Sequence, residues 1–563
     1  MSRLKGCAFL VYLLLLTGSQ GVFAQSPVNI KLKFVPRTEA KEKVVPDPTK
    51  LSDLVKAEAT ADSEAGIARV VFEVNDQFKA EVKTPPYLFN WDTLEETDGE
   101  STLSAIAYNN NGQTGTVRLK VTVENQLSKG ITYYAEKALE AMRRGDEIGL
   151  ERASRRAYKI NTQNPEAVRV MAVLIGLKGD INRAFGMLND NQNNVPKDAP
   201  ETLEVKGFLL RLRAFRNGNL QQMLPDLQEG MTLAKEQGTL LLRKLDSATP
   251  ADKADTKGRI LRGDAFTSQL KNTEALTEYE KASALAEGKD KKRAQLRQVM
   301  SLLRLRRLAE AEKLALKVVT SSPSDPKAHA VYATTLYAAK RYQAARDEVA
   351  QGILAKDPLS LIVACLSDLL LNAKREAYKE AQMAVEAADG GESQYAAMCL
   401  LADAGEPEPA KKSYINAALN APLFMPVFIE RAFQNIAYEK REDRFVEAIT
   451  LFDVVLRAEP DNAAANGGRA YAMLCQKRYN GAKSYLTKFS NLDPTSPDLF
   501  VLLAADASRD EKQAKAVTDA LSRARFLEPV NFKMQALPPI EDFARTMMRF
   551  RRVIPLTPSL LDR

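Results

Sequence analysis

Residues 448–494 read AITLFDVVLRAEPDNAAANGGRAYAMLCQKRYNGAKSYLTKFSNLDP, and one spacing of residue types occurs twice within them. A small residue, two larger apolar residues and a proline follow at intervals of four, three and five: Ala448, Phe452, Val455 and Pro460. The same order returns 34 residues later: Ala482, Leu486, Phe489 and Pro494. A small side chain allows two helices to approach closely, and proline ends a helix because it lacks an N–H group. A pair of short helices cannot bury its own apolar face, so the pattern predicts a stack of helical pairs.

The same spacing recurs along most of the chain. Further complete copies begin at Ala153, Ala311 and Ala410, and partial copies begin at Ala275, Ala345, Ala381 and Ala516. The pattern resembles the tetratricopeptide repeat (TPR), which implies an all-α superhelical solenoid over residues 126–530 with nine to eleven helical pairs. Residues 189–255 keep the period least well, so the number of pairs there stays open.

A different period precedes the helices, because residues 25–125 contain segments in which apolar and polar residues alternate. Examples are RVVFEVNDQFKAEV and TVRLKVTVEN, and turn pairs such as Asp98-Gly99 and Asn111-Gly112 separate such segments. Short alternating strands with regular turns predict an all-β sandwich. PYLFNWDT and DGESTLSAIA resemble the bacterial immunoglobulin-like (Ig-like) domain, which implies the same fold. Trp91 is the only tryptophan, and we expect it in the core rather than as an exposed platform for a sugar.

The first 24 residues have the pattern of a secretory signal peptide. Arg3 and Lys5 precede the apolar run CAFLVYLLLL, and the small residues Val22 and Ala24 come before Gln25. This pattern predicts cleavage before Gln25 and export to the periplasm or the cell surface. An uncleaved N-terminal anchor is the alternative. We expect no other membrane helix, since Asp368 interrupts the next most apolar run, SLIVACLSDLLL.

Composition excludes several classes of protein. The chain has 80 basic and 72 acidic residues in a mixed order, so a nucleic-acid-binding surface is not expected. Three cysteines remain after cleavage, Cys365, Cys399 and Cys475, and each lies in a helical apolar pattern. An odd number without a CxxC pair argues against a disulfide scaffold and a zinc ribbon, so we expect buried thiols.

The sequence offers little for catalysis. His329 is the only histidine, and we interpret it as a residue of a helix surface. Phosphate-binding glycine loops, a nucleophile elbow and a calcium loop are missing from the sequence. Carboxylate pairs are present, but they lie in a turn or on solvated helix faces. We therefore expect no enzyme activity, no cofactor and no metal.

Binding is the remaining function class. The TPR resemblance implies that the first helix of each pair lines a groove for a protein or peptide partner. Counting within each copy places seven residues there: Tyr337, Tyr395, Phe433, Lys440, Arg441, Tyr471 and Arg509. Aromatic and arginine side chains dominate recognition interfaces. The alternative for each residue is packing against a neighbouring repeat or exposure to solvent.

The sequence therefore predicts an exported, non-catalytic scaffold protein of the cell envelope. The alternative is a polysaccharide-associated protein that binds glycan through the Ig-like module or the groove. Residues 531–563 are expected to cap the open end of the solenoid, through the helical pattern DFARTMMRF, or to form a tail.

Overall fold

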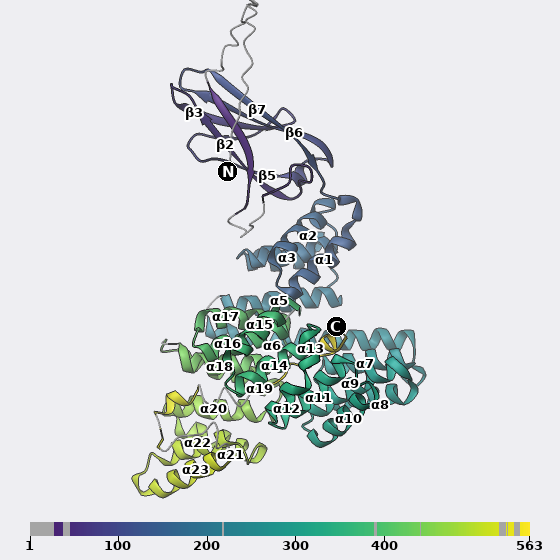
Figure 1. Ribbon diagram of the computed structural model, residues 1–563, viewed down its shortest axis with the longest axis vertical. Helices are drawn as coiled ribbons and strands as arrows, with labels where there is room; N and C mark the ends of the chain where they lie inside the picture. Colours follow the sequence, from purple (N-terminus) through teal and green to yellow (C-terminus); the bar gives the residue numbers. More distant parts are fainter. Residues whose placement is uncertain are drawn as a thin grey trace, which may run out of the picture. The chain divides into compact units, whose positions relative to one another are not determined.

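A computed structural model describes residues 28–37, 45–216, 219–387, 391–439, 441–527, 536–537, 539–544 and 552–562. Two compact units contain them, Met1–Ser128 and Lys129–Arg563. The first unit is built of strands and the second of helices, which Figure 1 shows, so the predicted fold class is confirmed. The predicted signal peptide lies outside the described residues.

The first unit is a β-sandwich of two antiparallel sheets. One sheet has the strand order β1-β2-β5 and the other has the order β4-β3-β6-β7. The strands of the described residues are β1 (Asn29–Val35), β2 (Leu54–Asp62), β3 (Ile67–Val74), β4 (Gln77–Val82), β5 (Tyr87–Asp92), β6 (Gly99–Asn109) and β7 (Thr114–Val123). Alternation of apolar and polar residues gives each sheet one apolar face, and the two apolar faces pack against each other.

Aromatic side chains fill the space between the two sheets. The rings of Phe72 in β3 and Phe89 in β5 stack with their centroids 5.2 Å apart. Trp91 is 1% exposed and belongs to the same core, as the sequence predicted. Its indole ring is therefore not available at the surface of the sandwich.

The second unit consists of helices that pack in consecutive antiparallel pairs. In the described residues the pairs are α1 (Ile131–Arg144) and α2 (Glu147–Ile160), α3 (Pro165–Leu177) and α4 (Ile181–Asn189), α5 (Pro200–Arg216) and α6 (Leu220–Ala248), α7 (Thr256–Thr267) and α8 (Asn272–Leu285), α9 (Gly288–Arg304) and α10 (Leu308–Ser321), α11 (Pro326–Ala338) with α12 (Tyr342–Glu348) and α13 (Ala350–Leu354), α14 (Pro358–Leu370) and α15 (Lys374–Ala387), α16 (Gly391–Ala404) and α17 (Pro407–Asn420), α18 (Pro426–Tyr438) and α19 (Arg444–Ala458), α20 (Ala463–Cys475) and α21 (Tyr479–Leu492), and α22 (Pro497–Ala507) and α23 (Ala514–Leu527). We call the first member of each pair its first helix.

The residues of the repeated spacing lie in the core where helices cross. Ala448 and Phe452 in α19 are fully buried, and the Phe452 ring meets Phe433 edge-on at a centroid distance of 5.3 Å. Gly468 in the next first helix lies so close that an added Cβ would be 2.4 Å from Phe452 Cε1. The proline of the pattern follows the end of the helix, since α19 ends at Ala458 and Pro460 comes next but one. The large ring therefore fills the space that small residues leave open.

The space around two helical glycines predicts different effects of an alanine substitution on stability. Gly468→Ala forces Phe452 and its neighbours to shift, and overpacking of this kind costs about 1–3 kcal/mol of unfolding free energy. Gly481→Ala in α21 meets only the flexible Met473 side chain, at 3.3 Å, so the better helix propensity of alanine leaves stability unchanged or raised by about 0.5–1 kcal/mol. Urea unfolding followed by circular dichroism at 222 nm measures both. Equal shifts in the two variants would contradict the packing described above.

The helical unit folds back on itself, so that early helices contact late ones. The Arg211 guanidinium in α5 donates from Nε and Nη2 to the Leu419 carbonyl oxygen in α17, at 3.1 and 2.8 Å. Arg457 in α19 donates from Nη1 to Gln228 Oε1 in α6 at 2.8 Å. Figure 1 shows α5 beside α17. Helices some 200 residues apart in sequence thus form one contiguous structure.

Helix α6 explains why the repeat period is weak over residues 189–255. It has 29 residues, about twice the length of the other second helices, and it contains Pro225 near its start. A helix of this length cannot keep a 34-residue period for its pair. None of the described helices, α6 included, combines the length and the apolar character that a bilayer crossing requires.

Candidate functional site

The described residues between 536 and 562, which we call the C-terminal segment, lie against first helices of the solenoid. Its start meets α20 and α18, residues 552 and 553 meet α16 and α11, and its end meets α14 and α9, so the segment runs broadly from later repeats to earlier ones. Its last part, the short helix α25 (Pro558–Asp562), packs against α9 and α14. We call the surface that these six first helices offer the first-helix face.

Tyr471 in α20 binds the start of the segment, where the short 3-10 helix η7 (Ile540–Asp542) lies. Its hydroxyl group donates to the carbonyl oxygens of Ile540 and Glu541, at 2.7 and 2.9 Å. It also accepts a hydrogen bond from the backbone N–H of Ala544 at 3.0 Å. Burial raises the pKa of Tyr471, so the hydroxyl keeps the proton that these bonds require.

Two further tyrosines bind the backbone of the segment at residues 552 and 553. The Tyr337 hydroxyl in α11 donates to the Arg552 carbonyl oxygen at 3.0 Å. The Val553 N–H donates to the Tyr395 hydroxyl oxygen in α16 at 3.1 Å. Both tyrosine side chains are buried, and burial raises the pKa of each, so both remain neutral. A buried hydroxyl group needs such partners, because burying it without a hydrogen bond costs free energy of folding.

The Arg552 side chain enters a buried acidic pocket, which holds the carboxylate of Asp403 and the carbonyl group of Cys399, and Glu430 lies close enough to act on its charge. Arg552 Nη2 donates to the Cys399 carbonyl oxygen at 3.2 Å, and Nη1 lies 3.8 Å from Asp403 Oδ1. Burial alone would lower the pKa of Arg552, but Cys399, Glu430 and Asp403 outweigh it and raise that pKa. Burial also raises the pKa of the Cys399 thiol, which therefore stays neutral. We assign the stabilisation of the guanidinium charge to the two carboxylates.

Apolar side chains hold the second half of the segment. Four of them are at most 6% exposed: Ile554, Leu556, Leu560 and Leu561. Residues 552–557 have no regular secondary structure, and Arg304 Nη2 in α9 donates to the Leu556 carbonyl oxygen at 3.0 Å. Burial of these side chains supplies non-directional stabilisation, and the hydrogen bond to the main chain fixes the position of the segment.

The end of the segment binds a basic cluster, Lys292, Arg293, Arg297, Lys327 and Lys356, that lines a cavity of about 760 Å³. Arg293 donates to both carboxylate oxygens of Asp562, at 2.9 and 2.7 Å, and Arg297 Nη2 donates to Oδ2 at 2.7 Å. Burial would raise the pKa of Asp562, but hydrogen bonds from the two arginines outweigh it and lower that pKa. The carboxylate is therefore held as an anion by a bidentate contact.

The structure brings three of the seven predicted groove residues onto the C-terminal segment: Tyr337, Tyr395 and Tyr471. Phe433 is fully buried, and its ring stacks on that of Tyr471 at a centroid distance of 6.1 Å. Phe433 therefore packs against a residue that binds the segment. A role of these residues in binding a partner stays a prediction.

The remaining predicted groove residues lie elsewhere or outside the described residues. Arg441 forms an ion pair with Glu447. The Arg509 guanidinium lies 4.4 Å from the centroid of the Tyr479 ring. Lys440 lies outside the described residues, and its position in a groove stays a prediction.

Sequence reasoning missed the charged residues that bind the ends of the segment. Arg293, Arg297 and Arg304 recur at intervals of four and seven, which puts them on one face of α9. Glu430 lies inside the apolar run PVFIERAFQNIAY of a first helix. A charge on the buried side of a first helix is the signal that could have revealed both sites, since such charges need a partner.

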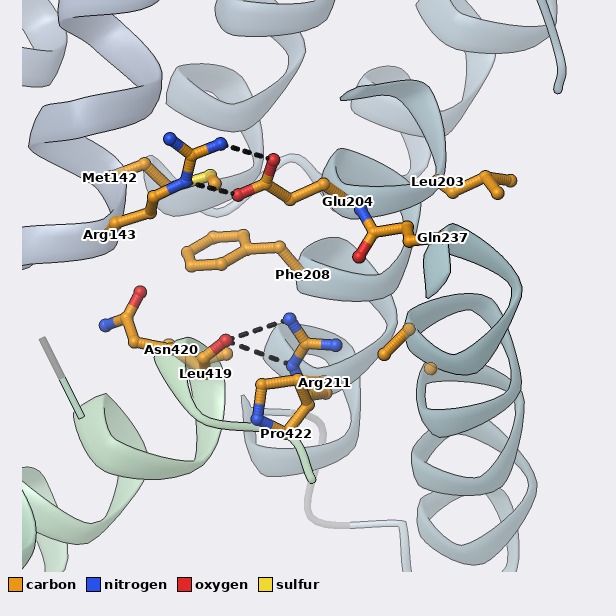
Figure 2. Close-up of a pocket in the computed structure, with 12 residues that line it drawn as sticks. Met142, Arg143, Leu203, Glu204, Phe208, Arg211, Gln237, Leu419, Asn420 and Pro422 are labelled. Carbon is orange, nitrogen blue, oxygen red and sulfur yellow. Dashed lines mark hydrogen bonds and ion pairs between the residues drawn. The ribbon is translucent and has the colours of Figure 1, made fainter. Parts of the chain in front are cut away.

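A second cavity, of about 140 Å³, lies where the solenoid folds back on itself (Figure 2). Arg143 in α1 forms a bidentate pair with Glu204 in α5, with both contacts at 2.7 Å. The Phe208 ring separates this pair from the contact between Arg211 and Leu419 (Figure 2). Burial lowers the pKa of Arg211 to about 10, so its side chain stays charged at neutral pH. The cavity is smaller than the roughly 300–1,000 Å³ typical of ligand sites, and we interpret it as a seam between helices.

The residues considered for catalysis have structural partners. His329 Nδ1 lies 2.6 Å from Glu348 Oε1, and Nε2 lies 2.8 Å from the Pro323 carbonyl oxygen. Cys365 and Cys399 are buried, as predicted, whereas Cys475 is only half-buried. Within the described part of the chain, His, Cys, Asp and Glu side chains form no cluster that could hold a metal ion.

Models of two known protein families match the chain, one in each of its two units. A model of the bacterial Ig domain matches residues 47–105. A model of the tetratricopeptide repeat matches residues 260–326 and 296–360. The chain therefore contains a bacterial Ig domain followed by tetratricopeptide repeats, a class of repeat typical of protein-interaction scaffolds.

Several solved structures are similar to parts of the chain. Clostridium thermocellum CbhA fibronectin(III)-like modules match at 22% identity over 17% of this chain and 97% of that one, with a TM-score of 0.13. The APC/C hetero-tetramer Cut9-Hcn1 matches at 13% identity over 72% and 95%, with a TM-score of 0.32. The human IFIT1 dimer with PPP-AAAA matches at 13% identity over 58% and 77%, with a TM-score of 0.38. No curated protein matched the chain.

Proposed function

We propose that this protein is an exported, non-catalytic scaffold of the cell envelope, and that its first-helix face holds a segment of a protein partner. One observation carries the proposal: the face already binds a peptide segment, residues 552–562 of the chain itself. Tetratricopeptide repeats support a function in protein interaction. The bacterial Ig domain is consistent with export.

The chemistry of the contacts supports peptide binding. Side chains of the face hydrogen-bond to main-chain atoms at five positions within residues 552–562: Arg552, Val553, Leu556, Pro558 and Leu560. Because every peptide has the same main chain, such contacts can hold segments of different sequence. The pockets for side chains then add specificity, as in other modes of peptide recognition.

Site-specific photo-cross-linking in the native host tests the proposal. A photoreactive benzoylphenylalanine replaces Lys356, which is exposed at the cavity of the basic cluster. Matched controls carry it at Leu316 on a second helix and at Phe78 in β4, which are 47% and 64% exposed. We expect a protein partner to cross-link from position 356 only. Cross-links confined to residues 552–562, or equal yields from the three positions, would count against a partner on this face.

The proposed export predicts a defined N-terminus for the mature chain. The chain isolated from the envelope fraction should begin at Gln25, because signal peptidase accepts the small residues Val22 and Ala24. Mass spectrometry of the N-terminal peptide measures this directly. Ala24→Arg should block cleavage and retain Met1. Recovery of an intact, uncleaved wild-type chain would contradict cleavage and favour an N-terminal anchor.

Glycan binding through the Ig-like module or the solenoid is the alternative proposal. Exposed aromatic rings commonly stack on sugars, but Trp91 lies in the sandwich core. A glycan array probed with the full chain distinguishes the two functions. Specific hits that survive Tyr337→Phe and Tyr471→Phe would favour glycan over a peptide on the first-helix face.

A further inference from the structure

We propose that the partner segment carries an arginine followed ten residues later by a carboxylate, and that it competes with the C-terminal segment of this chain for the first-helix face. This inference rests on the proposed function and names the chemistry of its ligand. The C-terminal segment supplies the template, because Arg552 and Asp562 occupy charged sites at its two ends.

The acidic pocket selects the first anchor. It accepts a side chain that is 4% exposed, provides the Cys399 carbonyl oxygen as an acceptor, and places the carboxylates of Asp403 and Glu430 near the guanidinium group. A neutral side chain would remove this cation from two buried carboxylates, of which Asp403 also lies 3.7 Å from Lys374 Nζ. Arginine suits the pocket better than lysine, since its guanidinium is planar, always charged and less strongly hydrated.

The basic cluster selects the second anchor. Of the charged residues that line its cavity, five are cationic and three are acidic, and one of the three is Asp562 of the segment itself. Arg297 also pairs with Asp264 through its Nε at 2.8 Å, a contact that does not involve the segment and that positions the guanidinium before a ligand binds. The cluster thus offers a preorganised bidentate site for one carboxylate. A side-chain carboxylate and the carboxylate of a chain end share this chemistry.

Between the two anchors, the first-helix face places fewer requirements on the sequence of the partner segment. The face covers Ile554 and Leu556 there and binds main-chain atoms. A competitor therefore needs apolar residues and no regular structure at these positions, rather than the same sequence. The partner segment must compete with residues 552–562, because these residues already occupy the first-helix face and one surface cannot bind two segments. An attached segment acts at an effective concentration of the order of millimolar, so it keeps weak ligands out.

A binding assay with the full-length chain tests this inference. The probe is a fluorescent peptide, Arg-Val-Ile-Pro-Leu-Thr-Pro-Ser-Leu-Leu-Asp, with both ends blocked, which copies residues 552–562. The receptor is either the wild-type chain or the double variant Arg552→Ala, Asp562→Asn, whose own segment is weakened. Fluorescence anisotropy should show binding to the variant that is about 100-fold tighter than to the wild type. Equal affinity for both receptors would overturn the competition.

Peptide variants test the two anchors. Arg→Ala at the first position, or Asp→Asn at the last, should weaken binding to the double variant at least about tenfold. An Asp→Asn peptide with a free C-terminal carboxylate reports whether a chain end can replace the side chain. If the substituted peptides bind as well as the parent peptide, the proposed ligand chemistry is wrong.

A second measurement covers the case in which the double variant does not fold. A protease site is inserted at residues 530–535 of the otherwise wild-type chain, and the chain is cut there before the assay. Excess parent peptide should then release the fragment that contains residues 552–562, while the Arg→Ala peptide should not; release by neither peptide would contradict the competition. Partner cross-links from position 356 without any peptide effect would refute this inference alone. Failure of both experiments would refute the proposed function too.

Discussion

Replacing Arg552 with alanine is expected to lower the unfolding free energy of the helical unit by about 3–5 kcal/mol, the usual cost of breaking a buried ion pair from one side. The guanidinium of Arg552 is a cation that acts on the carboxylates of Asp403 and Glu430 inside the solenoid, and Asp403 Oδ2 also lies 3.7 Å from Lys374 Nζ. Its loss removes a positive charge from two carboxylates in a low-dielectric site. Urea unfolding followed at 222 nm measures the effect, because helices dominate the signal there.

Two matched variants separate charge from packing. Arg509→Ala removes an arginine whose side chain is 43% exposed and paired with Asp506, so it should cost no more than about 1 kcal/mol. Arg552→Met keeps the apolar stem but removes the charge, so most of the loss should remain. An Arg552→Ala chain as stable as Arg509→Ala would show that the acidic pocket does not depend on the C-terminal segment.

Replacing Phe452 with alanine is expected to cost about 3–5 kcal/mol, the range for removal of a buried aromatic ring. Phe452 is fully buried between Phe433 on one side and the close backbone of Gly468 on the other. The cavity cannot collapse easily, because the small residue on its far side has no side chain to move inward. Chemical unfolding with the same optical signal measures the loss.

Phe526→Ala in α23 is the control, because its side chain is 74% exposed and its removal should change stability by less than about 0.5 kcal/mol. If Phe452→Ala were as harmless as Phe526→Ala, the repeated spacing of small and large residues would not describe the packing of helical pairs. Adding Gly468→Ala to Phe452→Ala should cost less than Gly468→Ala costs in the wild type, since the Phe452 ring is gone and only the Phe433 ring, 3.0 Å from the added methyl group, still crowds it.

Local sequence patterns predicted most of the fold, because its packing rules are local. The alternation that ends in Val121 and Val123 led to the sandwich, and the spacing of Ala448 and Phe452 led to the helical pairs. Both depend on residues within one or two elements of each other. The pattern did not reveal the length of α6, since a period records where a helix pair recurs and not how far one helix extends.

The binding sites were predictable only in part. Positions within each repeat pointed to Tyr337, Tyr395 and Tyr471 on first helices, and these side chains do bind the C-terminal segment. The sequence could not reveal that residues 552–562 occupy the face, because these contacts join positions far apart along the chain. The charged anchors were missed for a related reason: the role of a buried charged residue can be assigned only when its partner, which lies far away in the sequence, is known.

The contact of α5 with α17 and of α6 with α19 has a consequence for how the protein folds. In an open repeat array each unit touches only its neighbours, so folding can begin anywhere and the ends can fray independently. Here Arg211 and Leu419 meet across 208 residues of sequence. Such distant contacts raise the entropy cost of the folding transition state, which makes folding slow. They also tie the first turns of the array to its later ones, so that the helices between them gain or lose their structure together.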